Sequence, residues 1–182
     1  FVLEGTTGSI RRYDGVTGSK RGSFGARGDG VQNHRQPQRL AVGPTQILVV
    51  VDGAKGSALV RWDVSSAPGR FLGRWGGYSL AEDDRISCGP KGEVASLNRS
   101  TGHVTRLDRE GWITARFGGT GQIEHGRDLV VDARNWVFVL DEDKHAVLRF
   151  EPAGSPRGSF GKRGSSRLQF DSPIDLGAFR GD

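Results

Sequence analysis

Four copies of one short motif constrain the fold of this 182-residue chain more than any other feature. In each copy an aromatic residue is followed directly by glycine at the end of a short apolar run: Phe24-Gly25, Trp75-Gly76, Phe117-Gly118 and Phe160-Gly161. A second kind of apolar run begins at Leu40, Ile86, Leu129 and Ile174, with spacings of 46, 43 and 45 residues. Self-similarity at a fixed period of this size is the signature of a stacked repeat architecture.

The stretch 128–164 shows what one repeat contains. Its apolar runs at 129–131, 136–140 and 146–150 are of strand length, and a fourth, weaker run ends at Phe160-Gly161. These runs are rich in β-branched and aromatic residues and are bounded by Asp, Asn, Gly or Pro, which favours strands joined by tight turns. None of them places apolar residues at helical spacing. Each repeat is therefore predicted to be a four-stranded antiparallel sheet.

Sheets that recur in this way predict an all-β fold, a β-propeller of about four blades in a single domain, residues 1–182. The expected blade units are 37–76, 83–118 and 126–161, with one split unit made of 1–25 and 171–178. The chain thus begins with the last three strands of a unit and ends with the first strand of one. Either the N- and C-terminal strands pair and close the ring, or the chain is a fragment of a larger propeller.

The repeat units resemble NHL repeats. The resemblance rests on four segments, which read PQRLAV at 37–42, WVFVLD at 136–141, KHAVLRFE at 144–151 and FGKRG at 160–164. It implies a β-propeller, usually of six blades, that mainly binds other proteins and in some members RNA. A few relatives of that family are metal-dependent lyases. Since four units are present here, the resemblance implies that two blades are missing from the chain or that the ring closes in an unusual way.

Composition narrows the function classes. The single cysteine, Cys88, allows no internal disulfide bond, and no apolar run approaches the length of a membrane span. The net charge of +5 permits an acidic partner or nucleic acid without requiring either. The P-loop, Gly-x-Ser-x-Gly and Cys-x-x-Cys motifs are absent. The four histidines have no carboxylate at metal-ligand spacing, so we expect packing and hydrogen-bonding roles for His34, His103, His125 and His145.

No catalytic residue, metal site or cofactor is therefore predicted, and the chain is not expected to be an enzyme. The expected interaction surface is the side of the propeller that carries the loops between blades. Six basic residues fall there: Arg27, Arg39, Arg85, Arg127, Lys162 and Arg163. Arginine guanidinium groups on such a surface can bind carboxylate or phosphate groups of a partner through paired hydrogen bonds.

The leading functional prediction is a non-enzymatic scaffold or accessory subunit that binds other proteins of a larger assembly through its loops. Two alternatives stay open. One is a metal-dependent propeller lyase or hydrolase, and the other is a protein that binds RNA through the basic loops. By analogy with exported bacterial proteins that carry such repeats, we expect a periplasmic or extracellular location.

Overall fold

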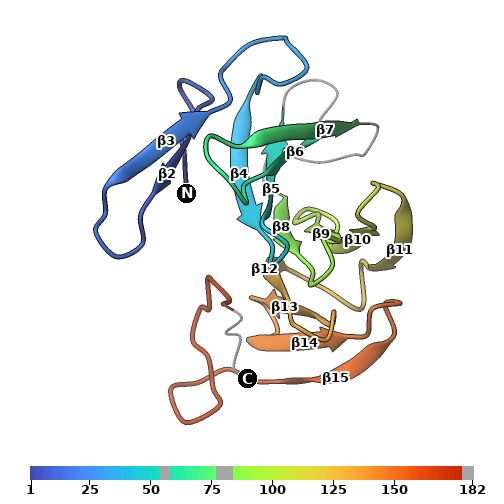
Figure 1. The fold of residues 1–182 in the computed structure, drawn as a ribbon. Coiled ribbons are helices and arrows are strands. Elements are labelled where there is room, and N and C mark those ends of the chain that lie inside the picture. The colour runs from blue at the N-terminus through green and yellow to red at the C-terminus, as the bar shows by residue number, and fades with distance from the viewer. Residues whose placement is uncertain (54–57, 77–83, 178–182) are drawn as a thin grey trace. The chain divides into compact units, whose positions relative to one another are not determined.

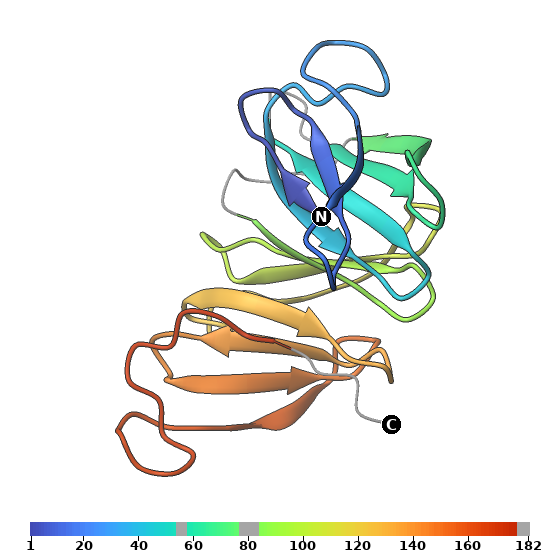
Figure 2. The same ribbon diagram turned by 60° about the vertical axis from the view of Figure 1, so that its left-hand side comes forward.

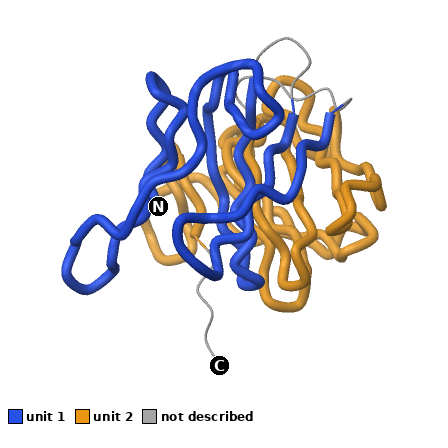
Figure 3. Tube along the Cα trace, turned by 45° about the horizontal axis from the view of Figure 1, so that its top comes forward, with its two compact units in different colours: residues 1–82 blue, residues 83–182 orange. Residues whose placement is uncertain are grey.

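The computed structural model describes residues 1–53, 58–76 and 84–177. The chain forms two compact units, Phe1–Glu82 and Asp83–Asp182, which Figure 3 shows in different colours. Within the described ranges there is no helix, and hence none that is long and apolar enough to cross a membrane. All regular structure in these ranges is antiparallel β-sheet, and every strand is paired with its neighbour along the chain.

The first unit contains two sheets (Figure 1). A three-stranded sheet has the order β1 (Val2–Leu3), β2 (Ile10–Tyr13), β3 (Lys20–Phe24). A four-stranded sheet has the order β4 (Pro37–Val42), β5 (Ile47–Asp52), β6 (Ala58–Asp63), β7 (Arg70–Gly76). One hydrophobic cluster of the first unit draws on both sheets: Ile10, Phe24, Leu48, Val50, Val60, Trp62 and Val64.

The second unit also contains two sheets, each of four strands. One has the order β8 (Arg85–Cys88), β9 (Val94–Leu97), β10 (His103–Leu107), β11 (Ile113–Gly118). The other has the order β12 (Gly126–Val131), β13 (Val137–Asp141), β14 (Ala146–Phe150), β15 (Pro156–Phe160), and Figure 2 shows its strands in orange. One hydrophobic cluster draws on both of these sheets: Ala95, Leu97, Val104, Ile123, Leu129, Val131, Val137, Val139 and Phe150.

The sheets follow the expected blade units closely. The predicted units 37–76 and 126–161 match β4–β7 and β12–β15, and β8–β11 match the unit 83–118, of which residue 83 lies outside the described residues. The split unit differs from the prediction. Residues 1–25 supply three strands, whereas 171–177 form no strand, and residue 178 lies outside the described residues. The backbone N–H of Leu176 instead donates to the carboxylate of Asp128, on β12.

The recurring aromatic-glycine pair has a steric cause. Gly25, Gly118 and Gly161 all have positive φ, at 70°, 82° and 100°. A Cβ atom on Gly25 would lie 2.8 Å from His34 Cε1, and one on Gly118 would lie 2.7 Å from Ile123 Cδ1. A Cβ atom on Gly161 would meet the ring of Phe170 in the same way. Any residue other than glycine would therefore be strained and would clash with a side chain of the following loop.

We call these three loop side chains, His34, Ile123 and Phe170, the plug residues. Each follows the last strand of a sheet and packs over the glycine that ends it. His34 and Ile123 are 0% and 1% exposed, whereas Phe170 is only half-buried. In these three copies the glycine is thus required because the loop after the sheet folds back onto the end of the sheet. The fourth copy differs, since a Cβ atom on Gly76 would meet nothing within 4 Å.

Candidate functional site

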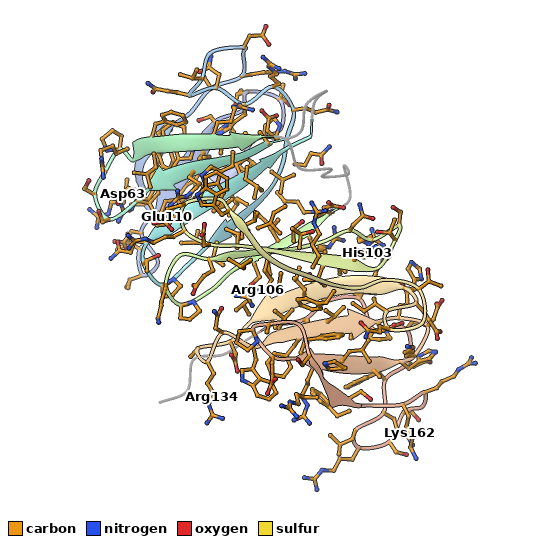
Figure 4. The ribbon with its side chains drawn as sticks, turned by 90° about the vertical axis from the view of Figure 1, so that its right-hand side faces the viewer. Asp63, His103, Arg106, Glu110, Arg134 and Lys162 are labelled. Atoms are coloured by element: carbon orange, nitrogen blue, oxygen red, sulfur yellow. The ribbon has the colours of Figure 1, made fainter. Side chains whose placement is uncertain are left out.

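The six predicted basic residues do not form one cluster. Arg27 lies in the loop after β3, and Lys162 and Arg163 lie in the loop after β15; all three are exposed. Figure 4 shows Lys162 in this last loop. The two loops have the same backbone arrangement. In each, the backbone forms an isolated parallel β-bridge, between Arg27 and His34 in the first loop and between Arg163 and Phe170 in the second.

The other three basic residues are half-buried, each on the first strand of its four-stranded sheet. Arg39 is on β4, Arg85 on β8 and Arg127 on β12. The Nε atom of Arg127 lies 3.6 Å from a carboxylate oxygen of Glu142. Whether any of these six residues contacts a partner stays a prediction.

The histidines mostly serve the fold. The Nδ1 atom of His34 lies 2.7 Å from the carbonyl oxygen of Gly8, and its Nε2 atom accepts a 3.3 Å hydrogen bond from the indole N–H of Trp62. His145 Nδ1 lies 3.1 Å from the carbonyl oxygen of Phe170. His103 is exposed at the start of β10, as Figure 4 shows. Among the described residues, no three His, Cys, Asp or Glu side chains converge in a way that could hold a metal ion.

Two buried acids lie at the end of the second strand of their sheets and accept hydrogen bonds from the loop that precedes the sheet. Asp52, which is 1% exposed, accepts hydrogen bonds from the backbone N–H groups of Arg35 and Gln36 and from the guanidinium of Arg74. Burial alone would raise the pKa of Asp52, but these donors together hold that pKa below its ordinary value. Asp141 accepts backbone hydrogen bonds at the equivalent place in the last sheet. These acids are therefore structural.

A different acid has the features of a reactive group. Asp128 is on β12, and its side chain is 13% exposed. One carboxylate oxygen accepts the N–H of Leu176 at 2.9 Å, and the other lies 3.9 Å from Nε of Arg85 on β8. When Asp128 is protonated, its carboxyl group donates a hydrogen bond to that of Asp175, which is exposed. Two carboxyl groups and a guanidinium thus meet beside the first strands of consecutive repeats.

The pKa values of the two carboxyl groups shift in opposite directions. Burial raises the pKa of Asp128 to about 6, and its hydrogen bond with Asp175 acts in the same direction. The same hydrogen bond lowers the pKa of Asp175, and the nearby charge of Arg85 also contributes to that lowering. A carboxyl group that titrates near neutral pH can accept or donate a proton, and a neighbouring guanidinium can stabilise developing negative charge.

A further contact fixes this arrangement. The N–H of Val131, near the end of β12, donates a 3.0 Å hydrogen bond to Oγ of Ser87 on β8. Ser87 and Arg85 belong to the same short strand, so this bond ties the strand that carries Arg85 to the strand that carries Asp128. Sequence reasoning selected Arg85 but missed Asp128, Asp175 and Ser87. The one available signal was their place at the first strand of each repeat.

Comparison with known proteins supports the fold. No protein-family profile and no curated protein sequence matches the chain. Among solved structures, virginiamycin B lyase from Staphylococcus aureus is similar with a TM-score of 0.59 at 12% identity, over 86% of this chain and 50% of that one. A streptogramin B lyase is similar with a TM-score of 0.60 at 11% identity, over 86% and 48%. Regucalcin, a calcium-binding protein from Agrobacterium tumefaciens, has a TM-score of 0.50 at 15% identity, over 82% and 52%.

These likenesses confirm the predicted fold class, an all-β chain built from β-propeller blades. The chain spans about half the length of these neighbours, which agrees with the expectation of a fragment of a larger propeller. A single domain stays a prediction, as do protein partners, RNA binding and an exported location.

The leading functional prediction, a non-enzymatic scaffold, is wrong as the main interpretation. The solved structures that carry the likeness include two lyases, at 12% and 11% identity, and these favour the enzymatic alternative over the scaffold. The sequence prediction searched for linear motifs, and no linear motif marks the Asp128–Asp175 pair, which is assembled from separate repeats.

Proposed function

We propose that this chain belongs to a propeller enzyme of the lyase or hydrolase class and that Asp128 is its proton-transfer group. The observation that carries the proposal is the meeting of the Asp128 and Asp175 carboxyl groups beside Arg85. The lyase neighbours support the same class at the level of the fold. The proposal includes NHL-type blades, in keeping with the segments at 136–141 and 160–164.

The chemistry follows from the protonation states. At neutral pH Asp128 is mostly ionised and accepts a proton from a carbon or a water molecule. In an elimination, the electron pair of the broken C–H bond forms a C=C bond, and the C–O bond breaks with its pair left on oxygen. Arg85 stabilises the negative charge that develops on that oxygen. In a hydrolysis, the same carboxylate activates a water molecule for attack on an ester carbonyl.

The metal-dependent form of this class does not fit the described residues. Their His, Cys, Asp and Glu side chains form no group of three that could hold an ion. The nearest approach is His125, whose Nδ1 lies 3.3 Å from Asp143 and 3.8 Å from Glu142. No step of the proposed chemistry is therefore routed through a metal ion.

The test uses lactone and ester probes, beginning with quinupristin, with which a catalytically inactive virginiamycin B lyase from S. aureus was crystallised. Mass spectrometry separates the two reaction types, because an elimination product has the mass of the substrate and a hydrolysis product is heavier by one water. We expect Asp128→Asn to lower the rate by about 10² to 10⁴-fold, the usual contribution of a general acid or base. Asp171→Asn is the matched control, since Asp171 is an exposed carboxyl group in the same segment as Asp175.

A second measurement needs no substrate. The carboxyl carbon resonance of Asp128 should titrate with a midpoint near pH 6 in the intact chain. In Asp175→Asn the midpoint should move to lower pH, because the Asp175 carboxyl group contributes to the raised pKa. A midpoint at the ordinary aspartate value of about 4 in the unmodified chain, or an Asp128→Asn rate equal to that of the control, would contradict the proposal.

A further inference from the structure

A pocket lies in the second unit, where the third and fourth strands of the last sheet meet the loop that precedes that sheet. It has a volume of about 200 Å³ and is mainly apolar. Its lining includes Gln122, Leu148, Phe150, Pro156, Gly158 and Ser159. Gln122 comes from the loop between β11 and β12, and the other five come from β14 and β15, which lie side by side in Figure 1. The pocket is therefore bounded by residues of two consecutive sheets within the second unit.

The first unit contains the equivalent place, which strand pairing identifies. Trp62 of β6 pairs with Phe71 of β7, and Phe150 of β14 pairs with Pro156 of β15. The aromatic residue that ends the preceding sheet packs on Trp62 in the first unit and on Phe150 in the second, with ring centroids 4.9 Å apart in both. The two sheets can therefore be compared position by position.

The first difference between them is an aromatic ring. In the first unit the ring of Phe71 packs edge-to-face against Trp62, with centroids 5.6 Å apart and ring planes at 70°. This is a preferred geometry for a pair of aromatic rings. In the second unit the same position opposite Phe150 is held by Pro156, whose ring is smaller and not aromatic. The second unit thus lacks one aromatic ring at this place.

The second difference is a long side chain. Arg74 on β7 pairs with Val60, and its guanidinium donates to the carbonyl oxygen of Asn33 in the loop before β4. Ser159 on β15 pairs with Leu148 in the equivalent way, but its short side chain cannot span from the fourth strand to the preceding loop. The pocket therefore lies where the first unit places an aromatic ring and the stem of Arg74.

We propose that this pocket binds a small phenol, a single aromatic ring with one hydroxyl group, in the place that the first unit fills with its own side chains. An apolar protein cavity of about 150 Å³ holds benzene, so about 200 Å³ accommodates one ring with a small substituent. Leu148, Phe150 and Pro156 supply apolar contacts. Gln122 and Ser159 bring hydrogen-bonding groups to the same pocket, which favours a hydroxylated ring over a plain hydrocarbon. The proposal rests on β14 and β15 and is independent of the acid pair on β12.

The decisive experiment is a titration of the full 182-residue chain with phenol, followed by proton–nitrogen correlation spectra. We expect the amide signals of Gly158 and Ser159 to shift and to reach saturation. Pro156→Phe introduces the residue that the first unit has at this position and should weaken phenol binding at least about tenfold, because the pocket is then overpacked by the ligand. Pro152→Phe is the matched control and should leave the affinity unchanged, since Pro152 is exposed in the turn between β14 and β15 and does not line the pocket.

A second variant and a second probe separate the outcomes. Ser159→Arg introduces the counterpart of Arg74 and should also weaken phenol binding at least about tenfold, so the test does not depend on the folding of one variant. Shifts that do not saturate, or an affinity for phenol that both variants leave unchanged, would overturn the proposal. Shifts with N-acetyltyrosine amide but none with phenol would overturn it as well, because the occupant would then be a side chain of a protein partner.

Discussion

Replacing Gly118 by alanine measures how strongly the plug arrangement constrains the sequence. Gly118 has φ of 82°, a conformation that costs a residue with a Cβ atom roughly 1–2 kcal/mol. The new Cβ atom would also lie 2.5 Å from the carbonyl oxygen of Gly102 and 2.7 Å from Cδ1 of Ile123. Overpacking of this kind costs about 1–3 kcal/mol. The two effects together predict a loss of about 2–5 kcal/mol in the free energy of unfolding.

Gly121 provides the matched control. It lies in the same loop with φ of 95°, but a Cβ atom there would meet nothing within 4 Å. Gly121→Ala should therefore show the backbone cost alone, about 1–2 kcal/mol. Urea unfolding followed by near-ultraviolet circular dichroism measures both variants under identical conditions. Equal losses for Gly118→Ala and Gly121→Ala would refute the reasoning, because the clash with Ile123 would then contribute nothing.

A double variant locates the clash. Combining Gly118→Ala with Ile123→Ala removes the Cδ1 atom that the new Cβ atom would meet. The two losses should therefore sum to more than the loss of the double variant. Because the Gly102 carbonyl oxygen remains in place, the relief should be partial. Strict additivity would indicate that the backbone contact, and not the plug residue, requires glycine.

Three further predictions concern charge. Burial lowers the pKa of His34, so below about pH 6.5 the unfolded chain binds a proton at this histidine that the folded chain does not. The free energy of unfolding should therefore fall by up to about 1.4 kcal/mol per pH unit as pH drops below that point. Urea titrations of His34→Gln should show a weaker dependence of stability on pH. Asp52→Asn should lower the free energy of unfolding by about 3 kcal/mol, because it leaves the Arg74 guanidinium without its buried carboxylate. An unchanged thermal unfolding temperature in this variant would contradict the structural role of Asp52. Hydrogen bonds from Ser65 and Arg70 lower the pKa of the half-buried Asp63 to about 2, so its stabilising effect should be present above pH 3.8 and lost as pH falls towards 2. In urea titrations, the stability difference between the unmodified chain and Asp63→Asn should vanish in acid.

The repeat spacing was sufficient to predict most of the strands. The runs at 129–131, 136–140 and 146–150 became β12, β13 and β14 within a few residues, because alternating burial and turn chemistry are local properties. The failures involve contacts between repeats. The tail at 171–177 has a strand-like sequence, yet it forms no strand with the described residues, and the N–H of Leu176 donates to the carboxylate of Asp128.

The acid pair was missed for a related reason. Asp128 and Asp175 are 47 positions apart, and neither sits in a motif that marks it as reactive. Their proximity depends on how first strands of successive repeats line up, which no single repeat encodes. The aromatic-glycine pair shows the opposite case: the sequence displayed it clearly, but its cause appeared only when the plug residues were located.

Each unit has its own hydrophobic cluster, made from its own two sheets. The apolar side chains of each cluster therefore come from within about 80 to 100 neighbouring residues. We expect that either half of the chain can reach its native packing while the other is still unstructured. During synthesis the first half could become compact before the second has left the ribosome. A gene for such a protein could also lengthen by duplicating a whole pair of sheets without exposing a half-built interior.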